Sequence, residues 1–445
     1  HTLDHLVFHH FDYQLPPLKN LIGSGKKEIP LAQVPIPSLA MYGCQEVDYV
    51  FRLKGILEQE LRHRKLENLL VDLELPLTRI LFQMECTGMF VDAECLARSG
   101  EKIVRDLTRA EGEIYSLAGE KFNITSPKQL SVILFEKLGI KPLKKTSTGL
   151  STRADVLEAL AEEYPIAQKI LEFRTLEKLR STYIEALPLA INPHTHRIHP
   201  TFSQYATATG RLACQDPNLQ NIPVRTPEGK RIREAFRPEK EGWSYLAADY
   251  SQVELRLLAH LSEDPQLIQA FQEGGDIHSF TASLVFGIPL EKITPLERHR
   301  AKAINFGIIY GQQAYGLSQE LGISTKEAER FIEAYFERYP RVLAFVNECI
   351  ERVRREGKGV TMLGREREIP EIYNTNALIR HAAERLAVNT PLQGSAADLI
   401  KQAMLEIDRV LKQERLEAKM ILQIHDELIF EAPDHELDSL KILVK

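Results

Sequence analysis

The sequence predicts an α+β fold in which long helical regions surround a small β-sheet. Apolar residues recur at three- and four-residue steps over residues 46–118 and again over 251–412, as is typical of amphipathic helices. Two short apolar segments, 243–249 and 419–431, instead have the length of strands, and each carries a carboxylate. A chain of 445 residues is long enough for two to four substructures, each with its own core.

The composition is that of a globular protein. Hydrophobic residues make up 44% and charged residues 27%, and no apolar run approaches the ~20 residues of a membrane span. The first ten residues do not resemble a signal peptide. Five scattered cysteines without a CxxC pair predict neither a zinc site nor a disulfide framework, and they indicate a reducing cytoplasm. The net charge of −6 does not exclude a nucleic-acid partner, because binding depends on where the charges lie.

The predicted elements follow in order along the chain. Residues 14–43 are rich in Pro and Gly and predict a loop with short helices. The helical pattern then begins at about residue 46 and is interrupted at 139–149 by a basic segment that contains glycine. Residues 195–238 are predicted to be irregular, and 243–249 to be a buried strand. Residues 419–431 predict a hairpin around His425, Asp426 and Glu427.

Residues 294–311 are predicted to form a helix with defined ends. Thr294 and Glu297 have the spacing of a capping box, Pro295 suits the first turn, and Gly311 can end the helix. Because both ends are set by local sequence, the residues that share one face can be assigned.

One face of this helix carries two cations followed by two aromatic rings: Arg298, Lys302, Phe306 and Tyr310. A step of four residues keeps them on nearly the same face, with a drift of about 40° per step. Arg and Lys can bind a triphosphate, and the rings can pack on a sugar or stack on a base. The pattern is equally typical of an amphipathic helix with a charged end and a buried aromatic end, and the helix alone favours that alternative.

Asp249 and Asp426 are candidate metal ligands. Magnesium prefers a few carboxylate oxygens together with substrate phosphate oxygens. Two ions ~3.5–4 Å apart would stabilise both the attacking and the leaving oxygen of a displacement. An isolated Asp at a strand end is more often a turn former, so the pair gains weight only together with the cationic helix.

Three segments, in this order, resemble the motifs of family A DNA polymerases. They are DYSQVELR at 249–256 (motif A), RHRAKAINFGIIYG at 298–311 (motif B) and QIHDE at 423–427 (motif C). Further matches are at 75–92, 122–130, 207–223, 276–278 and 391–399. The resemblance covers residues 1–445 and is to the bacterial polymerase I type, in particular its large (Klenow-type) fragments.

The resemblance implies a right-hand architecture with an antiparallel palm sheet and helical fingers and thumb. Residues 51–190 would be the thumb, 191–254 and 401–445 the two parts of the palm, and 255–400 the fingers. Residues 1–50 would be the C-terminal remnant of a 3′–5′ exonuclease-like domain. Its last motif, usually Tyr-x-x-x-Asp, runs here from Tyr42 to Glu46. The earlier exonuclease motifs are absent from the chain, so no 3′–5′ exonuclease activity is expected of it. The palm is expected to be truncated at its C-terminal end.

The resemblance also implies the roles of individual residues. Asp249 and Asp426 would hold two Mg²⁺ ions, for which Mn²⁺ can substitute, with the Tyr250 carbonyl as a further ligand. Lys302 and Glu427 complete the catalytic set, and Glu254 would exclude a 2′-hydroxyl. The nucleotide would be bound by Tyr250, Gln252, Glu254, His278, Arg298, Lys302, Phe306 and Tyr310. DNA would be bound by Arg211, Asn218, Arg385, Gln393, His425, Lys144 and Lys145.

The sequence therefore predicts a template-directed DNA polymerase that adds deoxynucleoside triphosphates to a primer 3′-hydroxyl and releases pyrophosphate, in DNA replication and repair. It would act as a cytoplasmic, nucleoid-bound monomer on primer–template DNA, away from membranes. The main alternative is a catalytically impaired DNA-binding fragment that lacks the palm C-terminus. A polymerase that makes RNA is disfavoured by Glu254, and an inactive DNA-binding scaffold by the presence of Asp249, Asp426 and Lys302. A purely structural helical protein would leave the cation–aromatic stripe unexplained.

Overall fold

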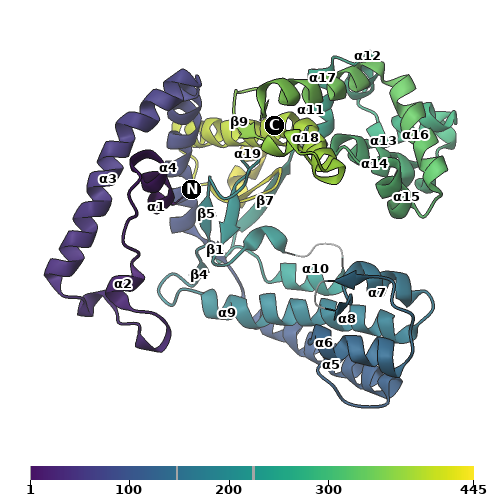
Figure 1. Ribbon diagram of the computed structural model, residues 1–445, viewed down its shortest axis with the longest axis horizontal. Coiled ribbons are helices and arrows are strands. Elements are labelled where there is room, and N and C mark those ends of the chain that lie inside the picture. The colour runs from purple at the N-terminus through teal and green to yellow at the C-terminus, as the bar shows by residue number, and fades with distance from the viewer. Residues whose placement is uncertain (1, 147–148, 223–225) are drawn as a thin grey trace.

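A small central sheet separates an N-terminal helical arm from two helical bodies (Figure 1). The computed structural model describes residues 2–146, 149–222 and 226–445. In Figure 1 the body that contains α5–α8 and the body that contains α11–α17 extend to the same side of the sheet, one below and one above it. The sheet and the two bodies each have their own apolar core, which agrees with the predicted α+β class.

The central sheet has three antiparallel strands in the order β10-β11-β7. Strand β7 (Trp243–Asp249) lies at one edge, and β10 (Lys419–Ile424) and β11 (Glu427–Pro433) form the hairpin predicted from the sequence. Glu427 lies opposite Asp249, and Pro433 lies opposite Trp243. The prediction that 243–249 is buried was wrong: β7 is half-buried because it has a neighbour on one side only, whereas β11 is buried from Leu428 onward.

The core of the sheet is closed by α4 (Leu75–Thr87), the first half of α5 (Ala93–Ala118), the last part of α18 (Ala377–Gln413) and α19 (Leu437–Leu443). Leu77, Met404 and Phe430 are fully buried there. Burial of each such side chain stabilises the fold by about 1.5–3 kcal/mol. The helices therefore fix the position of the sheet and of the residues at its ends.

The upper body in Figure 1 is helical, as predicted for 251–412. Its helices are α11 (Val253–Ser262), α12 (Pro265–Gln272), α13 (Ile277–Phe286), α14 (Pro295–Ile309), α15 (Ala314–Leu321), α16 (Thr325–Arg338) and α17 (Pro340–Glu356). Helix α18 links this body to the sheet, because Val388 and Leu392 lie in the core of the body and Met404 in that of the sheet. The hairpin of β8 (Lys358–Val360) and β9 (Glu366–Glu368) was not predicted, since three-residue strands leave no periodicity.

The lower body contains the second half of α5, α6 (Pro127–Ser131), the π-helix η4 (Val132–Lys137), α7 (Ala154–Ala161) and α8 (Pro165–Leu179). It continues into the π-helix η5 (Arg180–Glu185) and α9 (Ala186–Ala190). The predicted break at 139–149 is present and holds the short pair β2 (Lys145–Thr146) and β3 (Gly149–Leu150). Ser147 and Thr148 lie outside the described residues.

The N-terminal arm contains α1 (Leu3–Phe11), α2 (Lys19–Ile22), the long α3 (Ile36–His63) and the π-helix η3 (Leu69–Glu74). Two 3₁₀ turns, η1 (Gly25–Lys27) and η2 (Leu31–Gln33), lie in the predicted loop. The helical pattern begins ten residues before the predicted start at about residue 46, because the prolines at 35 and 37 occupy positions that suit a helix start. Tyr42 and Glu46 lie one turn apart in α3 and are joined by a hydrogen bond of 2.6 Å.

The prediction that 195–238 is irregular was only partly right. Strand β1 (Met89–Phe90) pairs with β4 (Arg197–Ile198), and β5 (Thr201–Ser203) pairs with β6 (Ala213–Gln215). Helix α10 (Pro227–Glu234) is capped by Thr226, whose side chain accepts from the Gly229 amide. Short 3₁₀ turns occur here as η6 (Leu219–Asn221) and elsewhere as η7 (Leu290–Lys292), η8 (Pro370–Tyr373) and η9 (Asp434–Glu436).

In the part of the chain that the structure describes, every helix is too short or too polar to cross a lipid bilayer. The five cysteines all lie in that part, and none of them forms a disulfide.

Candidate active site

Three carboxylates from two parts of the chain meet at one end of the sheet. Asp249 is the last residue of β7 and lies directly opposite Glu427, the first residue of β11. The Tyr250 amide donates a hydrogen bond to the Asp426 carbonyl (3.1 Å). Strand β10 ends at Ile424 and β11 begins at Glu427, so Asp426 lies in the two-residue turn between them and not within a strand. His425, the other residue of this turn, has the left-handed conformation (φ 54°). The antiparallel pairing brings Asp249 and Asp426 into one neighbourhood.

The electrostatics of this end of the sheet disfavour three negative charges. Burial, together with the charge of Asp426, raises the pKa of Asp249. Burial also raises the pKa of Glu427; Arg233 opposes this shift, and Asp249 and Asp426 add to it. Like charges held together raise one another's pKa, and a divalent cation between them would relieve the repulsion.

The donor set fits a hard cation that also binds its substrate. Asp249 and Asp426 offer carboxylate oxygens without forming a closed cage, which suits Mg²⁺ or Mn²⁺ completed by phosphate and water oxygens. Among the described residues, the group of three or more candidate ligands within 4.8 Å of one another is Glu417, His435 and Glu436. Glu436 is committed to the Glu417 and Ala418 amides, at 2.9 and 3.0 Å, so this group has a structural role.

Helix α14 presents the predicted stripe on its exposed face. The capping box of Thr294 and Glu297 is formed. The Lys302 Nζ lies 5.9 Å from the centre of the Phe306 ring, which stacks on Tyr310 at 6.2 Å with an interplanar angle of 15°. Lys302 and Tyr310 are exposed and Phe306 is half-buried, while Ile304 on the opposite side is fully buried. The alternative of a buried aromatic end is therefore contradicted by Tyr310, whereas Phe306 packs in part against the core of the upper body.

Arg298, at the start of the stripe, is held by a partner that the sequence did not single out. Its Nε and Nη2 donate to the two Asp276 oxygens at 2.7 and 3.0 Å. Asp276 also caps α13 through the Ser279 amide (3.0 Å). Burial raises the pKa of Asp276, but Arg298 and Ser279 together lower it to about 2. The sequence signal that could have drawn attention to Asp276 is its position at the start of the Asp276–His278 segment, where Asp is favourable as a helix N-cap.

His278 does not lie on the open surface where a direct triphosphate contact was predicted. It is 1% exposed because α13 packs against α14, and burial lowers its pKa to about 4. Its Nδ1 is hydrogen-bonded to the Asn305 side chain (3.0 Å), and its ring centre lies 5.9 Å from that of Phe306. In this arrangement His278 is a neutral side chain behind the stripe, and its contact with a triphosphate stays a prediction.

Glu254 connects the stripe to the carboxylate end of the sheet. It lies in the first turn of α11, is 7% exposed and accepts from the Arg211 Nη2 at 2.5 Å. Burial raises the pKa of Glu254, while Arg211 and Tyr310 oppose the shift. Gln252 makes the turn between β7 and α11 in the left-handed conformation (φ 56°). This turn places Glu254 beside Tyr310 and leaves Tyr250 38% exposed.

The residues predicted to bind DNA are only partly brought together. Arg385 lies against the end of the stripe, because a Cβ at Gly311 would be 2.9 Å from its Cγ. His425 is next to Asp426 in the hairpin turn. Lys144 and Lys145 belong to the lower body, where Lys144 pairs with Asp155 at 2.7 Å.

The two remaining predicted contacts lie nearer the sheet and the upper body. Gln393 is half-buried in α18. Asn218 is exposed and caps η6 by accepting from the Gln220 amide at 2.9 Å. Pro223, the last residue of the 207–223 segment, lies outside the described residues.

Comparison with known proteins identifies relatives over nearly the whole chain. The family model described as DNA polymerase family A matches residues 93–445. DNA polymerase I of Bacillus subtilis (strain 168) is 50% identical over 392 residues, which cover 88% of this chain and 44% of that protein. DNA polymerase I of Pseudomonas aeruginosa is 43% identical over 443 residues, which cover 99% of this chain and 48% of that protein. The chain thus spans about half the length of the curated relatives it matches.

A solved structure has the same fold. The POL domain of Pol1 from M. smegmatis, in complex with DNA primer-template and dNTP, superposes with a TM-score of 0.89 and 40% sequence identity. The match covers 100% of this chain and 74% of that one. The α+β fold predicted from the sequence is thereby confirmed at the level of the whole chain.

Proposed function

Because this chain belongs to DNA polymerase family A, we propose that it is a template-directed DNA polymerase that extends a primer 3′-hydroxyl with deoxynucleoside triphosphates. The observation that carries the proposal is that Asp249 and Asp426 lie together at one end of the sheet, and that Glu254 lies near both Asp426 and Tyr310, the last residue of the α14 stripe. Its partners would be primer–template DNA and nucleotides, and its role would be in DNA replication and repair.

In this proposal the central sheet and the two helical bodies correspond to the palm, fingers and thumb of the right-hand polymerase architecture. The sheet with its surrounding helices would be the palm, the α11–α17 body the fingers and the α5–α8 body the thumb. The residue limits of 51–190, 191–254, 255–400 and 401–445 remain our assignment, and residues 1–50 would belong to an exonuclease-like domain. Support comes from α18, which leaves the fingers core after Ala396 and enters the palm core at Ile400.

Family membership implies use of divalent metal ions in general; two Mg²⁺ ions at Asp249 and Asp426 are our proposal. Bound there, the ions would activate the primer hydroxyl and neutralise charge on the leaving pyrophosphate. The Tyr250 carbonyl would be a third ligand beside the pair, and Glu427 would help to orient them. Burial raises the pKa of Asp249 and the nearby charge of Asp426 adds to the shift, so a divalent cation bound there would stabilise the ionised pair.

The chain's own residues would do the rest by positioning and charge. Arg298 would bind the triphosphate in competition with Asp276, and Lys302 would give a proton to the pyrophosphate. Phe306 and Tyr310 would pack against the nucleotide and the template base, and Glu254 would exclude a 2′-hydroxyl. Preorganised charge of this kind supplies most of the acceleration in phosphoryl transfer.

Primer extension on a primed template, with Mg²⁺ and each nucleotide class in turn, tests the proposal. We expect extension with deoxynucleotides and little with ribonucleotides. Asp249→Ala and Asp426→Ala should abolish addition yet retain DNA binding, which depends mainly on phosphate contacts. Asp438→Ala, at a side chain that is 94% exposed on α19, is the matched control and should extend normally. Ordinary extension by either site variant would refute the assignment of the pair.

A further inference from the structure

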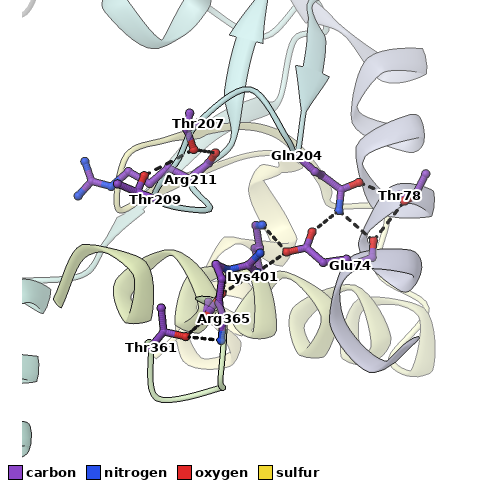
Figure 2. Close-up of polar contacts among 10 residues, drawn as sticks. Glu74, Thr78, Gln204, Thr207, Thr209, Arg211, Thr361, Arg365 and Lys401 are labelled. Carbon is purple, nitrogen blue, oxygen red and sulfur yellow. Dashed lines mark hydrogen bonds and ion pairs between the residues drawn. The ribbon is translucent and has the colours of Figure 1, made fainter. Parts of the chain in front are cut away.

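Four charged residues from three distant segments form a cluster, and Figure 2 labels three of them, Glu74, Arg365 and Lys401. The charge cluster consists of Glu74 at the end of η3, Arg365 in the β8–β9 turn, and Asp398 and Lys401 on α18. The Lys401 and Asp398 side chains are each 1% exposed, and those of Glu74 and Arg365 are 16% and 18% exposed. Burial of charge at this depth requires pairing.

The cluster is paired throughout. Lys401 Nζ contacts Glu74 Oε1 at 2.6 Å, and the Arg365 guanidinium bridges Glu74 and Asp398, with its Nε 2.7 Å from Asp398 Oδ1. Thr361 donates to the other Asp398 oxygen (2.6 Å) and accepts from the Arg365 amide (3.0 Å). The two positive and two negative charges therefore balance. Their hydrogen bonds join the β8–β9 hairpin, α18 and the end of η3.

One side of the cluster touches the loop 204–211. The Gln204 side-chain Nε2 donates to the Glu74 backbone carbonyl at 2.9 Å and to the Glu74 side-chain Oε2 at 2.5 Å. Gly210 lies flat against Arg365: a Cβ at Gly210 would be 2.6 Å from the Arg365 Nε. Figure 2 shows Gln204 directed toward Glu74 at one end of this loop, and Thr207, Thr209 and Arg211 grouped at the other.

The far end of the loop carries a site residue. Thr207 donates to the Arg211 carbonyl (2.6 Å), which closes the loop on itself, and the Arg211 side chain reaches Glu254 at 2.5 Å. A contiguous path of contacts thus runs from the charge cluster through Gln204 and Gly210 to Arg211 and Glu254. A carboxylate held by one guanidinium depends on where that guanidinium is placed.

We propose that the charge cluster positions the loop 204–211, so that Arg211 fixes the Glu254 carboxylate and the enzyme discriminates against ribonucleotides. This role rests on the proposed polymerase function. Glu74, Arg365, Asp398 and Lys401 are positioning residues, because they act through Arg211 and touch neither nucleotide nor DNA in this role.

The test measures the ratio of kcat/KM for a ribonucleotide to that for the matching deoxynucleotide on a primed template. Gln204→Met removes the hydrogen bonds of this side chain to Glu74 and Thr78 but leaves all four charges in place, so the fold should persist. Arg365→Lys keeps the charge but cannot bridge Glu74 and Asp398. We expect each variant to raise the ratio about fivefold, which corresponds to one net hydrogen bond. Glu254→Ala is the reference for a lost gate.

Arg197→Lys is the matched control. Arg197 pairs with Glu431 at a similar depth (14% and 7% exposed), but it joins β4 to β11 and does not contact the loop. It should lower thermal stability and leave the ratio unchanged. If thermal melting shows that Arg365→Lys does not fold, the ratio measured for Gln204→Met tests the proposal by itself.

The possible failures are distinguishable. An unchanged ratio in Gln204→Met, in an enzyme where Glu254→Ala raises it, would overturn the role of the charge cluster and leave the polymerase assignment intact. An equal rise in Arg197→Lys would also overturn it, because general loosening would then explain the effect. An unchanged ratio in Glu254→Ala would remove the gate and this role with it. Absence of primer extension by the unaltered chain would overturn both proposals.

Discussion

Replacing Asp249 by Asn removes one of three carboxylates at the end of the sheet while it keeps the shape of the side chain. In the metal-free chain this change should stabilise the fold. Two unit charges about 4 Å apart repel by about 1 kcal/mol in water and by about 4 kcal/mol at an effective dielectric constant of about 20. Neighbouring residues bury Asp249 in part, but its surface is still largely open to solvent, so solvent screening selects the lower end. We therefore expect a gain of about 1 kcal/mol in the free energy of unfolding of the region that contains the sheet.

The pH dependence of this gain has a defined sign. The folded-state pKa of Asp249 is raised, first by burial and then by Asp426. A carboxyl of this kind contributes stability that is present below its unfolded pKa and is lost as the pH rises through the raised folded value. The advantage of Asp249→Asn should accordingly be largest at neutral pH and should vanish toward pH 3, where Asp249 is protonated in both states.

Urea denaturation in the presence of a chelator measures the stability of the metal-free chain. Titration with Mg²⁺ then measures how far the metal stabilises it. Free Mg²⁺ at ten times its dissociation constant should stabilise the unaltered chain by about 1.4 kcal/mol and should stabilise Asp249→Asn far less. Asp438→Asn on α19 controls for the loss of one surface carboxylate. A variant less stable than the unaltered chain without metal, or equally stabilised by Mg²⁺, would contradict the assignment of a strained carboxylate pair.

Three further outcomes are expected. Glu254→Ala should raise ribonucleotide incorporation, because it removes the buried carboxylate beside Tyr310. The ribonucleotide-to-deoxynucleotide ratio in primer extension measures this, and an unchanged ratio would exclude Glu254 as the residue that rejects the 2′-hydroxyl. Phe306→Tyr should ease acceptance of dideoxynucleotides in a chain-termination assay, because it places a hydroxyl on the ring that packs at the nucleotide; identical termination patterns would count against that contact. Burial lowers the pKa of His278 to about 4, so the folded state resists its protonation, and stability should fall by about 2 kcal/mol between pH 7 and pH 5 from this group. In His278→Gln, urea denaturation at the two pH values should show a correspondingly smaller loss, and an equal loss would mean that His278 is not held neutral.

Much of the fold could be predicted because its signals are local. The ends of α14 depend on residues three positions apart, and the capping box of Thr294 and Glu297 is present where the sequence placed it. Strand β7 and the β10–β11 hairpin follow from short apolar runs. Elements of two or three residues, such as β1 and β8, were missed because so short a run leaves no periodicity.

The candidate site was predicted residue by residue, but its assembly was not. The sequence named Asp249, Asp426 and Glu254, and it could not show that antiparallel pairing and the turn at Gln252 bring them beside Tyr310. It likewise named His278, and it could not show that helix packing buries this side chain. Burial depends on which helices meet, and a local pattern does not contain that information.

The sequence by itself determined the helical and strand segments, the one-sided cation–aromatic stripe and the resemblance to the family, because each depends on residues close together in the chain. Only the tertiary structure decided that Arg298 is held by Asp276 and that Arg365 and Lys401 are neutralised by Glu74 and Asp398. Such partners lie far apart in sequence. Folding sets the pairing between them, and in the buried charge cluster each charge is paired because an unpaired charge would be too costly to bury.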